Sequence, residues 1–287
     1  MSVNKQVNYL DLFGTTFSLV FFGAKPWQRE EIDQRFSKKC SQDPQLQLSF
    51  FNAASCPTYL KKASEIIKKE KKTGFKEFLK KNPEFIIYDR KRHDFYYFFD
   101  KRGSLNSSVL LAAEGCFYYL GRKLGTIFLH SAGVCLNKHA YLFLAPSGGG
   151  KSTLAKLAKK NRLKVLSEEL LLVKQKHGGF YAYKFPSLLP QKGPLIKGLF
   201  FLKKGHTLKI QKISLIKSLA KAFGLGTYLL SAAPGRDLPL NRKHILNFLE
   251  KMFSCVKPYE LVFRKSDNVF RVIGENSNEE NKYFLKK

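Results

Sequence analysis

Hydrophobic residues in the larger, C-terminal part of this chain follow two patterns that alternate along the sequence. Short apolar runs of strand length alternate with segments whose apolar residues recur every three or four positions, as on one face of a helix. The predicted strand segments are 126–136, 139–144, two within 163–185, 194–205 and two within 259–273. The predicted helices are 104–125, 153–161, 213–226 and 242–256. This succession predicts an α/β domain whose mixed sheet is flanked by helices.

The N-terminal third has a different pattern, in which short apolar runs mix with charged ones. A strand is predicted at 15–23, basic amphipathic helices at 56–82, and two short strands around a polar turn within 83–103. We therefore expect a small α+β accessory domain over residues 1–105 and the α/β domain over 106–287. Aromatic and basic residues interleave within 89–99, which fits base stacking or, more commonly, a hairpin with one buried aromatic face.

Composition narrows the class of protein. A hydrophobic content of 44% in 287 residues excludes wholesale disorder, and the apolar run 12–24 is too short to span a bilayer. The five cysteines are widely spaced, odd in number and without a Cys-x-x-Cys pair: Cys40, Cys56, Cys116, Cys135 and Cys255. They predict reduced thiols and a cytoplasmic protein with no transmembrane segment.

The net charge of +29 would attract nucleic acid, anionic lipid or an acidic protein. Lysine greatly outnumbers arginine, however, and the lysines are spread over the whole chain rather than clustered. An AT-rich coding bias produces the same pattern, so we do not expect nucleic acid to be a partner.

Residues 145–152, Ala-Pro-Ser-Gly-Gly-Gly-Lys-Ser, follow a predicted strand and precede a predicted helix. This is the P-loop (Walker A) arrangement apart from Ala145, which replaces the first glycine of the pattern and fits there if its φ is negative. Glycines let consecutive amides form an anion nest, the lysine reaches the β- and γ-phosphates, and the serine hydroxyl ligates Mg²⁺. The alternative is a glycine-rich turn that a lysine follows by chance. The predicted ATP- and Mg²⁺-binding residues are Ser147, Gly148, Gly149, Gly150, Lys151, Ser152 and Thr153.

Phosphoryl transfer also requires a carboxylate, and two adjacent acids, Glu168 and Glu169, interrupt an otherwise apolar run 17 residues after Lys151. On an extended strand their side chains would point to opposite faces. The alternative is an exposed acidic pair at a strand end. His130 ends a predicted strand shortly before the loop.

Segments 128–158 and 165–173, together with Pro-Gly-Arg-Asp-Leu at 234–238, resemble the catalytic domain of HPr kinase/phosphorylase and its shorter relatives. The resemblance covers about residues 106–270 and implies a nucleotide-binding core similar to that of phosphoenolpyruvate carboxykinase. It implies that Glu168 is the base and a metal ligand, that Ser152 and Glu169 hold the metal too, and that His130 lies beside the phosphates. Arg236 would stabilise the charge of the transferred group.

Two departures limit what the resemblance implies. The family's regulatory N-terminal domain is not recognisable in 1–105, and its Glu-x-Arg-Gly phosphorylase signature is missing from 194–205. The sequence thus predicts a kinase that transfers the γ-phosphoryl group of ATP to a serine-type hydroxyl on a protein, peptide or small molecule. The sequence does not decide whether the chain forms a homo-oligomer. The alternative function is a nucleotide-dependent switch or ATPase that docks to nucleic acid or membrane through its basic surface.

Overall fold

The computed structural model describes residues 5–12, 15–22, 46–52, 85–89, 94–99, 121–185, 193–225 and 242–274, together with 30, 32–34, 36, 39, 44 and 117. These residues form two compact units, one containing the described positions up to Phe117 and one starting at Gly121. The helices expected at 56–82 and the domain boundary expected at 105 lie outside the described residues.

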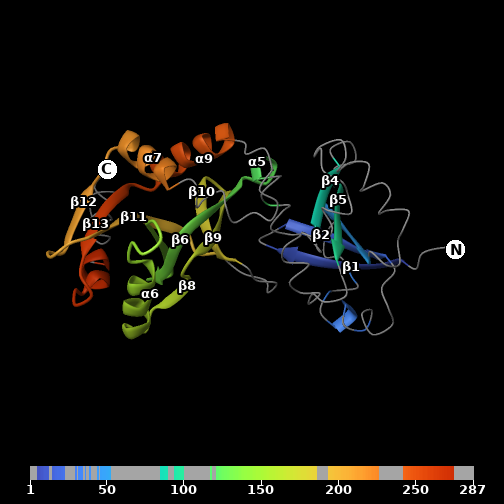
Figure 1. Ribbon diagram of the computed structural model, residues 1–287, viewed down its shortest axis with the longest axis horizontal. Helices are drawn as coiled ribbons and strands as arrows, with labels where there is room; N and C mark the ends of the chain where they lie inside the picture. The colour runs from blue at the N-terminus through green and yellow to red at the C-terminus, as the bar shows by residue number, and fades with distance from the viewer. Residues whose placement is uncertain are drawn as a thin grey trace, which may run out of the picture. The chain divides into compact units, whose positions relative to one another are not determined.

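The first unit is a five-stranded sheet with strand order β1-β2-β3-β5-β4 (Figure 1). Its strands are β1 (Lys5–Leu12), β2 (Thr15–Phe22), β3 (Leu46–Asn52), β4 (Phe85–Asp89) and β5 (Asp94–Phe99). β2, β3 and β5 run parallel, whereas β1 and β4 each pair antiparallel with a neighbour. The strand expected at 15–23 and the strand pair expected within 83–103 are both present.

Aromatic side chains fill the core of the first unit. Phe21 of β2 stacks on Phe50 of β3 with ring centroids 4.8 Å apart, and both are buried. Phe17 meets Phe117 edge to face at 5.6 Å. Parallel strands buried on both faces need such apolar residues at successive positions, and β2 provides them.

The second unit is built on a mixed sheet with strand order β10-β9-β6-β7-β11-β13-β12, in which β8 also pairs with β6. The central strands β7, β11 and β13 are parallel and the remaining pairs are antiparallel. The bounds are β6 (Thr126–Leu136), β7 (His139–Leu144), β8 (Lys164–Ser167), β9 (Leu170–Lys176), β10 (Gly179–Lys184), β11 (Ile196–Lys204), β12 (Lys209–Lys212) and β13 (Pro258–Phe263).

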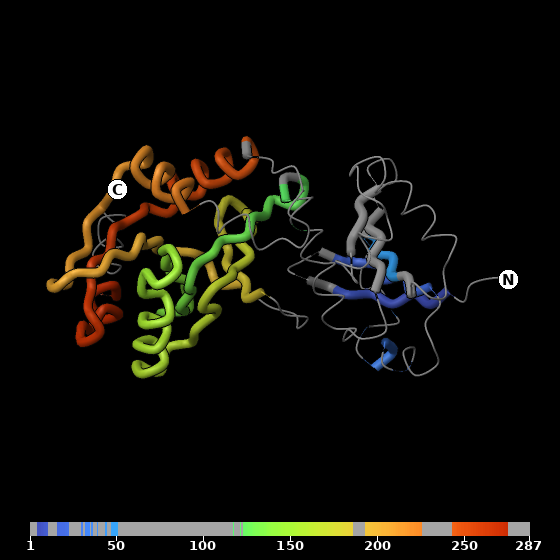
Figure 2. The backbone as a smooth tube through the Cα atoms, in the orientation of Figure 1, coloured from blue at the N-terminus to red at the C-terminus, as the bar shows by residue number. Residues whose placement is uncertain are grey.

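Helices cover both faces of this sheet, as the course of the backbone shows (Figure 2). On one face, α7 (Leu215–Gly224) and α9 (Arg242–Cys255) pack against Leu142 and Leu144 of β7. On the other, α6 (Lys151–Lys160) packs against Phe143. The mixed α/β architecture with flanking helices agrees with the sequence pattern. No helix among the described residues is long and apolar enough to cross a membrane.

A tight turn joins β6 and β7 in the two-residue gap between the predicted strands 126–136 and 139–144. Asn137 and Lys138 have φ values of 50° and 66°, and Leu136 pairs with His139 across them. Positive φ at both central residues defines the type I′ turn, whose twist matches that of the flanking strands.

Two predictions about secondary structure were wrong. Segment 163–185 forms three strands instead of two, because β8 and β9 are separated by a bend at Glu168–Glu169. The acid pair is thus not on an extended strand. The Ser167 hydroxyl accepts hydrogen bonds from the backbone N–H groups of Glu169 and Leu170, both at 3.2 Å, which stabilises the bend.

The second error concerns 259–273, for which a strand pair was expected. β13 is present, but 269–274 are helical. Val269, Phe270 and Ile273 are buried in the same core as α6, a spacing that only a helix can direct to one side. Phe270 lies edge to face with Phe143 at 6.2 Å. Tertiary burial therefore overrides the strand preference of the β-branched residues.

Candidate phosphate-binding site

The glycine-rich loop connects the end of β7, a strand buried on both faces, to the start of α6. Gly148 and Gly150 have φ values of 72° and 106°, in the region that favours glycine, and Gly150 is the N-cap of α6. Gly150 has no side chain with which to cap the helix, and the first turn contains no acidic residue. The positive end of α6 is therefore neither capped by a side chain nor neutralised by an acid, as an anion-binding helix start requires.

Lys151 is folded into the loop. Its Nζ donates to the carbonyl oxygen of Ala145 at 2.7 Å and to that of Pro146 at 3.1 Å, and only 7% of the residue is exposed. Burial lowers the pKa of Lys151 from its ordinary value, and the carboxylate of Glu169 opposes this shift. A cation is thus held inside the curve of the loop by two carbonyl groups.

Ala145, the departure from the P-loop pattern, fits because of Gly149. A Cβ added to Gly149 would lie 2.6 Å from the Cβ of Ala145 and 3.0 Å from the Pro146 carbonyl oxygen. Ala145 is not among the described residues with positive φ, as its side chain requires. The Gly149 N–H donates to the Pro146 carbonyl at 3.0 Å, which closes the turn. The loop thus accommodates one Cβ between positions 145 and 149.

His130 and Glu169 are both coupled electrostatically to Lys151. Burial is the largest cause that lowers the pKa of His130, the positive charge of Lys151 adds to it, and Glu169 opposes both. His130 lies on β6 opposite Leu170, the first residue of β9, so the strand pairing brings His130 close to the bend that holds Glu169. Three of the predicted site residues therefore form one electrostatically coupled group.

Glu168 has a different environment. Its Oε1 accepts a hydrogen bond from Lys159 Nζ at 2.7 Å, and both side chains are substantially exposed. Lys159 lies in the last turn of α6, away from the loop at the helix start. The bend separates the two acids, so that Glu168 pairs with the end of α6 while Glu169 interacts with Lys151 and His130.

The remaining predicted residues divide into two sets. Ser147, Gly148 and Ser152 are exposed, and Gly149, Gly150 and Thr153 are half-buried, so the loop's outer surface is open to solvent. Arg236 lies outside the described residues. Within the described part of the chain, no group of three His, Cys, Asp or Glu side chains could by itself hold a metal ion. An ion here would require the Ser152 hydroxyl and oxygen atoms of a phosphate ligand.

Ser131 was not singled out from the sequence. It is fully buried, it pairs with Leu144 at the end of β7, and its Oγ has no hydrogen-bond partner. A buried hydroxyl without a partner costs free energy, and such groups are rare. The sequence offers little signal for it, because a serine between His130 and Ala132 is typical of many strands.

Comparisons with known proteins do not assign this chain to a family. No family model matches it, and no curated protein matches it. Among solved structures, it is similar to that of the Hpr(Ser) kinase/phosphatase from Coxiella burnetii, at 8% identity and a TM-score of 0.27. That match covers 56% of this chain and 99% of the other.

Proposed function

We propose that the second unit is an ATP- and Mg²⁺-dependent kinase that transfers the γ-phosphoryl group to a hydroxyl acceptor. The observation that carries the proposal is the buried ammonium group of Lys151, held within a glycine loop at an uncapped helix start. This arrangement fits a polyphosphate, because loop amides, helix end and lysine all favour negative charge at one point.

The contacts of Lys151 and the position of Ser152 suggest which residue binds the phosphates and which binds the metal. The Lys151 ammonium exchanges its carbonyl partners for the β- and γ-phosphate oxygens of ATP, and the first amides of α6 bind the same oxygens. The exposed Ser152 hydroxyl, at the helix start, is the protein ligand of the metal. Mg²⁺ supplies charge neutralisation between the β- and γ-phosphates.

We assign the base to Glu169, although the resemblance favoured Glu168. Glu169 is exposed, so an acceptor can reach it, and its charge interacts with Lys151 at the phosphate position. Glu168 is paired with Lys159 instead. Because its pKa is lowered, His130 is neutral near pH 7 and adds no further positive charge beside Lys151.

The first experiment measures binding of ATP with Mg²⁺ by calorimetry. Lys151→Ala should weaken binding by about tenfold to a hundredfold, the range for losing hydrogen bonds from a charged group. Lys156→Ala is the matched control, because Lys156 is exposed on the same helix. Melting curves of both variants check the fold. Equal affinity of the Lys151 variant and the wild type would refute the loop assignment.

The second experiment measures transfer of label from γ-labelled ATP to acceptors in a cell extract, identified by mass spectrometry. Glu169→Gln should keep ATP affinity and lower transfer about a hundredfold or more, as expected for loss of a general base. Glu168→Gln should transfer at nearly the wild-type rate. A larger loss of transfer in Glu168→Gln than in Glu169→Gln would identify Glu168 as the base instead. Release of free phosphate without any labelled acceptor would favour the ATPase or switch alternative.

A further inference from the structure

A cavity of about 390 Å³ lies in the second unit and is not lined by any residue of the phosphate loop. One side of the cavity is a face of α9. The other side is formed by Gly125, just before β6, and by Gln175, near the end of β9. The lining residues are Gly125, Gln175, Lys243, His244, Asn247, Phe248 and Lys251. Its volume is at the lower end of the range for small-molecule sites.

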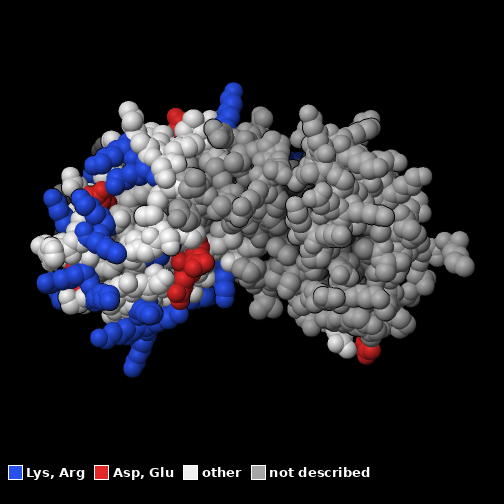
Figure 3. All heavy atoms as spheres, viewed as in Figure 1, with Lys and Arg blue, Asp and Glu red and all other residues white. Residues whose placement is uncertain are grey.

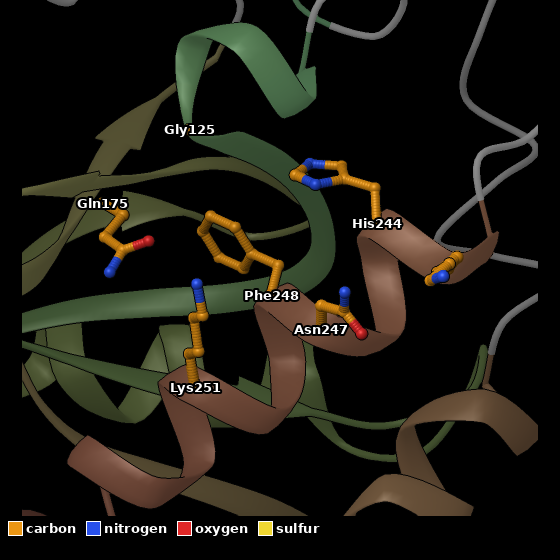
Figure 4. Close-up of a pocket in the computed structure, with 7 residues that line it drawn as sticks. Gly125, Gln175, His244, Asn247, Phe248 and Lys251 are labelled. Carbon is orange, nitrogen blue, oxygen red and sulfur yellow. The ribbon is translucent and has the colours of Figure 1, made fainter.

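The polar groups of this cavity are predominantly hydrogen-bond donors. Lys243, Asn247 and Lys251 are spaced four residues apart along α9, so they form one stripe along the helix. No residue that lines the cavity is acidic. In Figure 4 the amide of Gln175 and the ammonium of Lys251 extend toward the same space beside the Phe248 ring. Two cations and two amides that share a hollow favour a negatively charged occupant.

The cavity also has a fixed apolar floor. Phe248 is 4% exposed and is held edge to face by Phe180, with ring centroids 5.3 Å apart. The His244 ring lies 6.0 Å from Phe248, and its Nε2 is 3.2 Å from the backbone carbonyl oxygen of Thr126. Because a carbonyl only accepts, this contact is a hydrogen bond when Nε2 carries the proton. A rigid ring beside cationic groups suits an organic molecule with an acidic group.

The cavity and the phosphate loop are separate but share a strand. Thr126, which contacts His244, begins β6, and His130 follows four residues later. Four residues of an extended strand span about 13 Å. Substitutions on α9 can therefore test the cavity without altering the loop.

We propose that this cavity is a binding site for a small organic anion, one that presents a phosphate or carboxylate group to Lys251 and Gln175 and its apolar body to Phe248. The site is independent of the proposed phosphoryl transfer. A surface lysine stripe without function would lack the hollow, the amide groups and the fixed aromatic floor that accompany the lysines here.

The test uses inorganic phosphate as the probe, with the full chain in about 0.15 M salt so that long-range attraction by the net charge is screened. The protein carries Lys151→Ala, which removes the loop's contribution. Titration is followed by NMR of the side-chain amide groups of Asn247 and Gln175. We expect saturable shifts at one site, and about tenfold weaker binding in the additional variant Lys251→Ala.

Lys209→Ala is the matched control, since Lys209 is exposed on β12 and does not line the cavity. It should leave the phosphate affinity unchanged. Melting curves of the Lys251 variant confirm that it is folded. The proposal is overturned if the Asn247 and Gln175 signals do not move, or if the Lys209 and Lys251 variants lose affinity equally, because the binding would then be general attraction to a basic protein.

Discussion

Burial disfavours the charged forms of Lys151 and His130, and the charge of the exposed Glu169 acts on both of them. The acid stabilises the charged forms of both basic groups. The coupling can be measured at His130 without knowing the acceptor, since Lys151 and Glu169 both change the pKa of His130.

The coupling predicts a titration result for His130. Glu169→Gln removes the group that raises the pKa of His130, so the pKa should fall further, whereas Lys151→Met should raise it. Glu168→Gln should leave it unchanged, because Glu168 is not among the causes of the shift. The measurement is an NMR titration of the His130 ring proton. A shift in the Glu168 variant as large as in the Glu169 variant would contradict the geometry of the bend.

The lowered pKa of His130 also determines how the stability of the fold changes with pH. Because the pKa of folded His130 is lowered, the unfolded chain binds more protons between the folded and unfolded pKa values. The free energy of unfolding is therefore unaffected by His130 above the ordinary histidine pKa. It decreases as pH falls from that value through the folded pKa of His130.

At this scale the sequence predicted that His130 and an acid lie close to Lys151, but it did not predict that Glu168 and Glu169 have different partners. The loop glycines and Lys151 follow from a pattern whose geometry is local. The bend at Glu168–Glu169 depends on Ser167 and on the pairing of β8 and β9 with different parts of β6, which local sequence does not specify.

Among the elements, the β6–β7 hairpin contains avoidable strain. Lys138 has a φ of 66°, which costs a residue with a side chain about 1 kcal/mol relative to glycine. Lys138→Gly should therefore raise the free energy of unfolding by about 1 kcal/mol, measured by chemical denaturation. Lys138→Ala, which removes the charge but not the strain, should give no such gain. Equal stability of the two variants would mean that φ is not the cause.

Elements with a strong period were predictable, and those that depend on partners were not. α6 and α9 show helical spacing in the sequence and are present. Segment 269–274 reads as a strand because of Val269 and Ile273, and it becomes helical because its apolar side chains reach the core beneath α6 only in that form.

On the face of the second unit that Figure 3 shows, basic side chains outnumber acidic ones. Figure 3 shows lysine and arginine distributed over the second unit rather than gathered in one stripe, with few acids between them. Some of these lysines are paired, such as Lys221 with Glu260 at 2.7 Å, which lowers the pKa of Glu260.

A dispersed charge predicts weak and salt-sensitive binding to duplex DNA. Affinity should be poorer than about 1 µM at physiological salt and should fall steeply as salt rises, because binding would release counterions without specific contacts. Fluorescence anisotropy with a labelled duplex measures this. Submicromolar binding that persists at physiological salt would instead support a nucleic-acid partner.

The close approach of the Ala145 side chain to Gly149 affects how such loops are recognised in other sequences. A search that demands glycine at the first position discards this chain, although the space that the glycine would leave open is filled by a methyl group that faces Gly149. The rule that this geometry obeys is conditional: position 145 can have a side chain because position 149 has none, whereas a side chain at 149 would also crowd Pro146. Genome scans that accept alanine at the first position when glycine stands four residues later would recover loops of this kind.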